Sequence, residues 1–385
     1  MKVVLLSNFL NPHTVNLCIE FLLHKKVKEF YFIATVQQSK ERELLGFKEL
    51  NHQYDFVLRM YNENEKKIAI ELIKNADVVI SGGLGNEFVT QRIKDNKLTF
   101  IYSERIYKFG LYRCMNPISR KNIYEKLLKY KNNNVYYLSV GAYMPYDLSL
   151  LGFPKEKIFQ WAYFPEVKCL KIEKSAQLTL LWVGRMIKEK HPQIAVEIAE
   201  KLKLLGIEFR LVMIGDGPEA KKIQDSVREK GLETQVEFLG ICPPDVTQSY
   251  MAESKVFLFT SDYWEGWGAT LSESMGHGCV PIASYKAGAS EILIENDING
   301  YIYHTIDEAI AAIKNLLQDE VKMIHLSDVA KYTIETKWSA KNAVYNFIKV
   351  AESLLNGQDY LQINETEPMA KATIRKAKNY FSSDF

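Results

Sequence analysis

The chain has 385 residues, which exceeds the size at which a single hydrophobic core keeps growing, so we expect two domains. Its composition is ordinary for a globular protein, with 47% hydrophobic residues, 25% charged residues and a formal net charge of +2, which gives no support to a nucleic-acid-binding protein. The five cysteines are scattered without a CxxC pair, so the sequence favours reduced thiols over a disulfide framework or a zinc site.

Through the first half of the chain, short apolar or β-branched runs alternate with helical patterns. Strands are predicted at Val3–Leu6, Glu29–Ala34, Asp55–Leu58, Val78–Ile80, Thr99–Ile101, Tyr136–Leu138 and Ile158–Gln160. Helices are predicted between them, including Thr14–His24, Glu65–Lys74 and Arg120–Lys131. The alternation is typical of a parallel sheet with helices on both faces.

A polar break follows at Phe164–Gln177, and the same pattern then starts again. Its strands are predicted at Leu178–Val183, Arg210–Ile214, Val236–Leu239, Val256–Phe259, Pro281–Ser284 and Gly300–Tyr303. Its helices are predicted at Pro192–Leu205, Pro218–Lys230 and Glu273–His277. We therefore expect an α/β protein with two doubly wound, Rossmann-like domains, residues 1–165 and 166–345, which face each other across a ligand-binding cleft. Residues 346–385 are expected to form a helical tail that packs back on the first domain, with helices at Ala340–Leu355 and Pro368–Phe381.

The most informative motif runs from Glu265 to Glu273, where two glutamates flank a glycine-rich turn that opens a helix. A buried strand precedes the turn, so free backbone N–H groups and the positive helix end would bind an anion at one spot. Carboxylates accept hydrogen bonds from hydroxyl groups. We therefore expect a nucleotide-sugar, with its diphosphate at the turn and its ribose and hexose at the two acids.

Cationic residues follow the strand that ends at Val183. Arg185 and Lys190 lie beyond it, where a guanidinium fork and an ammonium charge can hold a diphosphate. Taken alone, a solvated charged loop explains the segment equally well. Gly215 begins a loop that formally matches G-x-G-x-x-A, but Asp216 and Glu219 would repel a pyrophosphate, so a shaping turn is the better interpretation.

In the first half, His13 follows a predicted strand and is a catalytic candidate, and Glu104 and Arg105, which follow another strand, are weaker candidates for an acceptor side of the cleft. His13 lies in the first strand–helix loop and is the better chemical candidate, although a polar helix-entry residue explains it about equally well. For Glu104 and Arg105, a surface ion pair is the slightly better explanation.

A basic, aromatic segment spans residues 105–131. Its members are Arg105, Lys108, Arg113, Arg120, Lys121, Lys126, Lys129 and Lys131, interleaved with Tyr107, Phe109, Tyr112, Tyr124 and Tyr130. Such a surface can rest on anionic lipid headgroups, although a solvated helix face is the more common explanation. The sequence shows no signal-peptide pattern and no window near the ~20 apolar residues of a membrane-spanning helix. We expect a cytoplasmic protein, with peripheral contact to the inner face of an anionic membrane as a hypothesis.

Together these motifs resemble the retaining nucleotide-sugar glycosyltransferases with two Rossmann-like domains, the GT-B type, and specifically glycosyltransferase family 4. The resemblance extends from Leu178 to about Tyr303 and rests on motifs that recur in the family's order. They are Val183-Gly184-Arg185 with Lys190, Ile214–Pro218, Val236–Gly240, Ser261–Pro281, and Ala287–Ile292 with Asn299-Gly300. Three mild departures are Trp267 in place of the more usual Phe, Ala287 in place of a glycine, and His191 where a glycine is common.

The resemblance implies a role for each matching position. Arg185 and Lys190 would hold the donor diphosphate, Glu265 would contact the transferred sugar, and Glu273 would bind the ribose hydroxyls. The donor site would also include Gly184, Gly215, Gly266, Trp267, Gly268 and Ala269, with Gly240 and Ile241 beside the base. The resemblance further implies transfer with retention, a UDP- or GDP-linked sugar as co-substrate, a sugar or lipid-linked acceptor, and no required cofactor or metal. An envelope or capsule polysaccharide role follows from the same resemblance.

Other functions stay open at this point. A nucleotide-sugar 2-epimerase of the same architecture would convert the donor without an acceptor, and a non-catalytic subunit would only bind it. A dehydrogenase is the weakest alternative, because its glycine fingerprint lies in the middle of the chain beside acidic residues.

Overall fold

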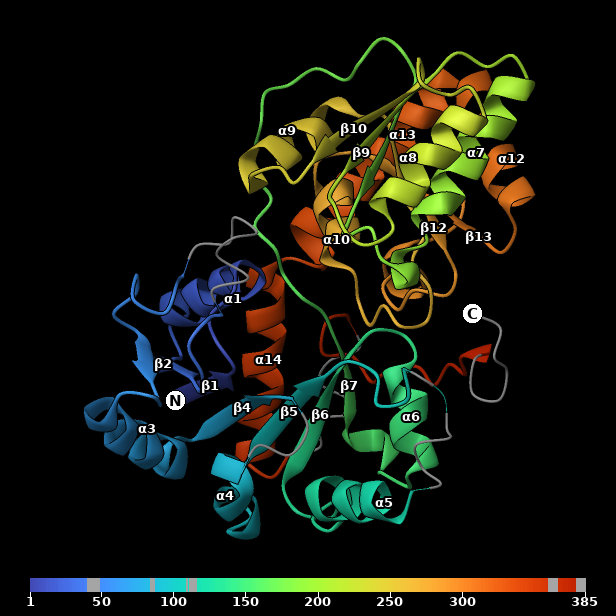
Figure 1. The fold of residues 1–385 in the computed structure, drawn as a ribbon. Helices are drawn as coiled ribbons and strands as arrows, with labels where there is room; N and C mark the ends of the chain where they lie inside the picture. Colours follow the sequence, from blue (N-terminus) through green and yellow to red (C-terminus); the bar gives the residue numbers. More distant parts are fainter. Residues whose placement is uncertain (40–48, 84–86, 109, 111–115, 359–365, 379–385) are drawn as a thin grey trace. The chain divides into compact units, whose positions relative to one another are not determined.

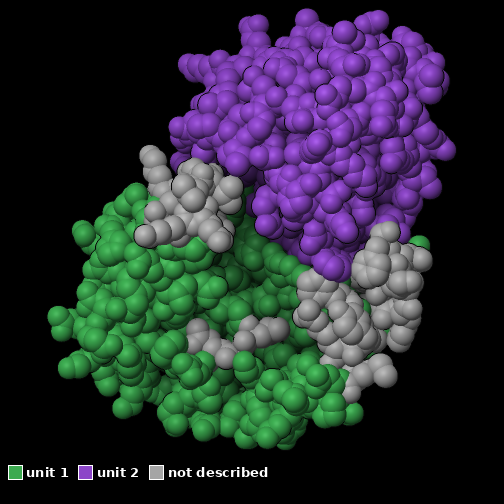
Figure 2. Space-filling model, in the orientation of Figure 1, with its two compact units in different colours: residues 1–165, 338–384 green, residues 166–337, 385 purple. Residues whose placement is uncertain are grey.

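The computed structural model describes residues 1–39, 49–83, 87–108, 110, 116–358 and 366–378. The chain divides into two compact units, which Figure 2 shows in different colours. Unit 1 comprises residues 1–165 and 338–384, and unit 2 comprises residues 166–337. Each unit is built on one parallel β-sheet wound with helices (Figure 1), so the α/β prediction of two doubly wound sheets is confirmed.

The sheet of unit 1 has seven strands in the order β3-β2-β1-β4-β5-β6-β7. The strands are β1 (Lys2–Ser7), β2 (Glu29–Ala34), β3 (Val57–Arg59), β4 (Val78–Gly82), β5 (Thr99–Ser103), β6 (Val135–Val140) and β7 (Ile158–Trp161). The helices before the linker are α1 (Pro12–Leu23), α3 (Glu63–Asn75), α4 (Thr90–Lys94), α5 (Pro117–Ile123) and α6 (Met144–Leu150). Every residue of β6 is buried, as expected for a strand of a parallel sheet covered on both faces. The strand order reverses between β1 and β4, so a crevice opens there at the carboxyl ends of the strands.

The sheet of unit 2 has six strands in the order β10-β9-β8-β11-β12-β13. The strands are β8 (Thr179–Val183), β9 (Arg210–Ile214), β10 (Val236–Gly240), β11 (Val256–Phe259), β12 (Val280–Ser284) and β13 (Tyr301–Tyr303). The helices are α7 (Pro192–Leu204), α8 (Ala220–Glu229), α9 (Pro244–Glu253), α10 (Ala269–Gly276), α11 (Ser290–Leu293), α12 (Ile306–Gln318) and α13 (Glu320–Tyr332). Leu180, Leu211 and Ile313 are fully buried in the core that joins this sheet to its helices. The strand order reverses between β8 and β11.

The last long helix belongs to unit 1. α14 (Ala340–Leu355) packs beside α1, and its Phe347 ring contacts the Phe21 and Phe100 rings at centroid distances of 5.5 and 4.8 Å. The domain boundary expected at residue 345 falls inside this helix, whereas the units divide between residues 337 and 338. The boundary lies before α14 because this helix packs on unit 1, as its contacts with α1 and those of Phe347 with Phe21 and Phe100 show.

The predicted helix Pro368–Phe381 is wrong over its described residues, because residues 366–377 form no helix. Met369 N–H donates to Gln160 O (2.9 Å), and Gln160 N–H donates to Ala370 O (2.9 Å). Lys371 then forms an antiparallel bridge with Phe159. The segment therefore satisfies its backbone on β7, the edge strand of the sheet, whose outer hydrogen-bonding groups need a partner.

Candidate functional site

The candidate donor site lies in unit 2, at the carboxyl edge of its sheet. Two loops leave neighbouring strands there: residues 184–191 after β8, which we call the Lys190 loop, and residues 260–268 after β11, which we call the Glu265 loop. The strand order reverses between β8 and β11, and such a switch point is where open α/β sheets bind ligands. The fold therefore brings the two charged motifs of the sequence together.

Lys190 and Glu265 meet across the two loops. The ammonium group of Lys190 forms an ion pair with Oε2 of Glu265, and Ser261 Oγ donates to the same oxygen (3.5 Å). Only 19% of the Lys190 side chain and 15% of the Glu265 side chain are exposed, so water screens this pair less than a surface pair. A cation and a hydrogen-bond acceptor thus lie at one point of the edge.

Arg185 is exposed at the start of the Lys190 loop, next to Gly184. The loop after β9 approaches Gly184 so closely that a Cβ atom at Gly215 (φ +128°) would lie 1.8 Å from Gly184 O. Gly184 N–H donates to Ile214 O (3.0 Å), and Gly215 N–H donates to Gly240 O (2.7 Å). These bonds connect the ends of β8, β9 and β10, so glycine at position 215 shapes the edge on which Arg185 stands.

The Glu265 loop ends in a turn that opens α10. Gly268 has φ +90°, and a Cβ atom there would lie 2.2 Å from Cζ of Phe259, so the turn requires glycine. Trp267 is fully buried, and its Nε1–H donates to Ser272 Oγ (3.2 Å), which fixes the turn against the first residues of the helix. Gly266 is buried beside it, and Ala269 is the first residue of α10. The first N–H groups of α10 have no acceptor within the helix and are available to an anion.

Glu273 lies in the second turn of α10, about 6 Å along the axis from Ala269. Side chains of a helix tilt towards its N-terminus, so the carboxyl group lies over the turn that precedes it. The side chain is partly buried, and this desolvation raises the pKa of the Glu273 carboxyl from 4.5 to about 7. Hydroxyl groups that donate to the carboxylate would favour its ionised form.

The end of β10 supplies the last of the predicted donor-site positions. Gly240 takes a left-handed conformation (φ +64°), and the pairing register of β10 with β9 shifts between Phe238 and Gly240. Ile241, the next residue, is 51% exposed. An exposed apolar side chain beside the edge is a surface on which a planar base can pack.

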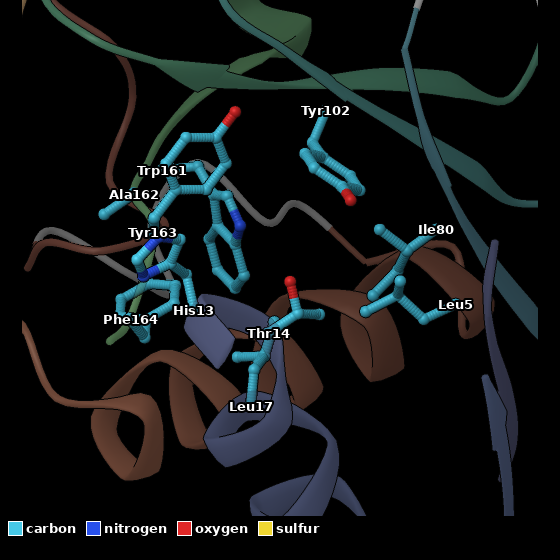
Figure 3. A pocket seen from close by; sticks show the side chains of 10 residues that line it. All are labelled: Leu5, His13, Thr14, Leu17, Ile80, Tyr102, Trp161, Ala162, Tyr163 and Phe164. Atoms are coloured by element: carbon cyan, nitrogen blue, oxygen red, sulfur yellow. The ribbon is translucent and has the colours of Figure 1, made fainter. Parts of the chain in front are cut away.

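His13 lies at the start of α1 and lines a pocket in unit 1 (Figure 3). The pocket is found where the strand order of unit 1 reverses, and its lining residues are Leu5, His13, Thr14, Leu17, Ile80, Tyr102, Trp161, Ala162, Tyr163 and Phe164. The His13 ring stacks on the Tyr163 ring at a centroid distance of 6.5 Å. Burial raises the pKa of Tyr102 to about 12, and its hydroxyl donates to Ser7 Oγ (3.0 Å). The pocket is thus mostly aromatic and aliphatic, with His13 as its one imidazole.

Glu104 and Arg105 take different positions. Glu104 forms an ion pair with Lys108, and each side chain is about a quarter exposed. The Arg105 side chain is fully buried, and its Nη2 lies 3.5 Å from Oδ1 of Asp147. The other Asp147 oxygen accepts the Ile106 and Tyr107 N–H groups at 3.0 Å. Arg105 thus forms an ion pair, as the sequence favoured, but the pair is buried and not at the surface; its acceptor-side role stays a prediction.

The sequence analysis did not identify a second contact between the two donor-site loops. His191 Nε2 lies 2.9 Å from Oδ2 of Asp262. The available signal was positional: His191 directly follows Lys190, and Asp262 comes just after the predicted strand Val256–Phe259. Within the described part of the chain, no group of three or more His, Cys, Asp or Glu side chains gathers in a metal-binding arrangement.

A comparison with protein families matches residues 171–336 to the family described as glycosyl transferases group 1. The matched residues all lie within unit 2 and cover it except for residues 166–170 and 337. Unit 2 therefore carries a group 1 glycosyltransferase region, and the resemblance inferred from the motifs is confirmed at this level. Assignment to family 4 in particular stays a prediction.

Curated relatives match over part of the chain. A lipopolysaccharide 1,6-galactosyltransferase of Salmonella typhimurium is 30% identical over 167 residues, covering 42% of this chain and 45% of that protein. A GDP-Man:Man(3)GlcNAc(2)-PP-Dol alpha-1,2-mannosyltransferase of Dictyostelium discoideum is 25% identical over 191 residues, covering 48% of this chain and 35% of that protein. The chain thus spans less than half the length of these relatives.

Solved structures match over most of the chain. Alr3699/HepE of Anabaena, in complex with UDP, has a TM-score of 0.65 and 14% identity, covering 90% of this chain and 99% of that chain. At this identity the likeness concerns the fold alone. It agrees with the two parallel sheets described above, and the fold is of the GT-B type.

Proposed function

We propose that this chain is a retaining glycosyltransferase that moves a sugar from a UDP- or GDP-linked donor to an acceptor hydroxyl. One observation carries the proposal: Lys190, Glu265 and the N-terminus of α10 gather at the switch point of unit 2, inside the group 1 region. The cation, the acceptor carboxylate and the free N–H groups suit the diphosphate and hydroxyl groups of one ligand.

The donor diphosphate is the leaving group, and negative charge develops on it as the sugar departs. Arg185 and Lys190 place cationic groups at the edge, and the N-terminal amides of α10 add donors that are already oriented. Groups that face developing charge in a fixed geometry lower the barrier because they need little reorganisation during the reaction. Lys190 is paired with Glu265 in the unliganded chain. A diphosphate that binds would therefore share the positive charge of the Lys190 ammonium group with the Glu265 carboxylate.

The two glutamates would bind the two ends of the donor. Glu265 accepts hydrogen bonds from hydroxyl groups of the transferred sugar, and Glu273 accepts them from the ribose. Ile241 offers its apolar surface to the base. The raised pKa of Glu273 fits a carboxyl group that is partly desolvated in the unliganded chain and accepts hydrogen bonds from hydroxyl groups when the donor binds.

Retention is proposed to follow from attack on the face that the diphosphate leaves. The acceptor oxygen bonds to the anomeric carbon while the bond from that carbon to the phosphate oxygen breaks. The diphosphate departs with the electron pair, and the acceptor proton passes to its departing oxygen. This route requires no cofactor and no carboxylate side chain that acts as a nucleophile.

The acceptor is proposed to be a sugar or a lipid-linked sugar of an envelope or capsule polysaccharide. The name of the Salmonella relative, which acts on lipopolysaccharide, supports this class. His13 stays the catalytic candidate of unit 1, because it lines the pocket of Figure 3 at the reversal of strand order.

A basic surface of unit 1 is proposed to rest on anionic lipid at the inner face of the membrane. It consists of Arg120 and Lys121 on α5 and Lys126 on the short π-helix Tyr124–Leu128 that follows, all exposed, together with the exposed side chains of Ile118 (71%) and Tyr124 (53%). Phe109, Tyr112 and Arg113 of the predicted segment lie outside the described residues. None of the helices in the described chain is both long enough and apolar enough to cross a bilayer.

Co-sedimentation at low salt tests this surface with phosphatidylglycerol vesicles and phosphatidylcholine vesicles. The wild type is expected to bind the phosphatidylglycerol vesicles and not the phosphatidylcholine vesicles. The double variant Arg120→Glu, Lys121→Glu should bind the phosphatidylglycerol vesicles several-fold less. Absence of wild-type binding would contradict the membrane contact.

Incubation with UDP- and GDP-linked hexoses, followed by NMR of the anomeric protons, tests the transfer reaction. Both nucleotides belong in the panel, since the Dictyostelium relative is named for GDP-mannose and the HepE complex contains UDP. A product with the donor's anomeric configuration is expected when an oligosaccharide acceptor is present. Conversion of the donor to an isomer of equal mass without an acceptor would indicate a 2-epimerase. Binding without any conversion would indicate a non-catalytic subunit.

A further inference from the structure

The Lys190 loop contains a residue in a conformation that its side chain disfavours. His191 has φ +45° and ψ +54°, in the left-handed region that residues with a Cβ rarely adopt. Such residues persist where the surrounding contacts hold them, and they are common at functional sites. The contacts that hold His191 therefore point to what the conformation achieves.

Both ring nitrogens of His191 are engaged. Gln193 Nε2 donates to Nδ1 (3.0 Å), which fits the tautomer that carries its proton on Nε2, and Nε2 donates to Asp262 Oδ2 (2.9 Å). The second Asp262 oxygen accepts the N–H of Trp264 (2.8 Å). His191 and Asp262 are largely buried, with exposed side-chain fractions of 18% and 13%. The ring thus joins the end of the Lys190 loop to a carboxylate fixed within the Glu265 loop.

Backbone contacts continue this connection to the residues on either side. Asp262 N–H donates to Glu189 O (3.0 Å), and Thr260 Oγ donates to Lys190 O (2.5 Å). Thr260 Oγ also accepts from Nε1 of Trp182 in β8 (2.9 Å). The main chain of Lys190 is therefore held on both sides by groups of the Glu265 loop or its strand.

We propose that His191 and Asp262 are positioning residues, which hold the Lys190 loop against the Glu265 loop and so fix the Lys190 ammonium at the diphosphate. His191 is adjacent to Lys190, and the left-handed turn at His191 directs its ring to Asp262 while Lys190 reaches Glu265. Glycine would adopt the same backbone without strain but would lose the bond to Asp262. The kinetic part of this inference rests on the proposed transfer reaction, and the structural part does not.

The test compares His191→Gly with the wild type by steady-state kinetics in the donor and by amide hydrogen exchange of the unliganded protein. Loss of the bond should speed exchange of peptides that cover residues 185–191 and 260–266. It should lower kcat between about tenfold and 100-fold with the donor KM changed by less than threefold, because misplacing a charged group by about 1 Å can cost that much in rate. Asp262→Ala should reproduce both effects, and the double variant should be little worse than either single variant.

Asp297→Gly is the matched control. Asp297 is also a non-glycine residue with positive φ (+67°) in unit 2, and its carboxylate accepts from Tyr301 and pairs with Lys322. Glycine there removes the same kind of strain and side-chain contacts away from the two loops, so kcat should not change. Unchanged exchange in both loops of His191→Gly would overturn the proposal, as would wild-type kcat in an active enzyme. If the wild type transfers no sugar from any donor, the proposed function fails, and the exchange result still decides whether the pair holds the loops.

Discussion

Replacing Glu273 by glutamine should make the unliganded protein more stable while it weakens nucleotide binding. The folded state raises the pKa of this carboxyl from 4.5 to about 7, so between these values the folded chain binds more protons than the unfolded chain. Stability is therefore lost as the pH rises through this window, and the loss is complete above pH 7. The shift corresponds to about 3 kcal/mol as an upper bound, because the side chain keeps some contact with solvent. Glutamine is nearly isosteric and removes this cost.

The assay is thermal unfolding of wild type and Glu273→Gln from pH 4.5 to 8.5, without nucleotide. A domain of about this size gains roughly 2–4 °C per kcal/mol, so the variant should melt several degrees higher at pH 8 and about equally at pH 4.5. Glu233→Gln, the same change at an exposed glutamate of unit 2, should show no such pH-dependent gain. A variant that is no more stable than wild type at pH 8 would refute the reasoning from desolvation.

Three further predictions concern single positions. Gly268→Ala should lower the stability of unit 2 by at least about 2 kcal/mol, seen as a lower melting temperature, because φ is +90° and the Cβ atom would strike the Phe259 ring; an unchanged melting temperature would contradict the described turn. Arg105→Met should lower the free energy of unfolding in urea by about 3–5 kcal/mol, because the buried Asp147 carboxylate loses its ion-pair partner, and should leave nucleotide affinity unchanged. A large loss of affinity with normal stability would instead place Arg105 in the binding site. Arg185→Ala should lower kcat by about 10²–10³-fold with a small change in donor KM, and a change in KM alone would mean that Arg185 only binds the ground state.

The sheets could be predicted from the sequence because parallel strands buried on both faces appear as short apolar runs. Each predicted strand corresponds to a strand of the structure, with ends that differ by at most two residues. Several helices of unit 2 were missed: α9 (Pro244–Glu253) and α13 (Glu320–Tyr332), whose apolar faces are less regular, but also α12 (Ile306–Gln318), whose apolar face is regular. The prediction of a helix in the last segment failed for another reason. Residues 366–377 form hydrogen bonds with the edge of β7, and a local sequence pattern cannot reveal such a long-range contact.

The candidate site could be predicted in part. The residues after β8 and β11 carry charge in the sequence, and parallel topology brings the carboxyl ends of strands to one edge, so the meeting of Lys190 and Glu265 follows from pattern and topology. Contacts between particular side chains do not follow. Arg105 and Glu104 look alike in sequence, yet the Arg105 side chain is fully buried against Asp147, whereas the Glu104 side chain is partly exposed and pairs with Lys108. The His191–Asp262 contact likewise depends on a backbone conformation that the sequence does not reveal.

The most direct test of the central claim is a melting-temperature panel of UDP, GDP, ADP, CMP and NAD on wild type and Glu273→Ala. A ligand at about 100 times its dissociation constant stabilises the folded state by about 2.7 kcal/mol, which is visible as a melting shift. We predict that, of the five ligands, only UDP or GDP raises the melting temperature of the wild type. Glu273→Ala should largely lose this shift. If no nucleotide raises the melting temperature, or if only NAD does, a sugar-nucleotide donor site in unit 2 would be contradicted.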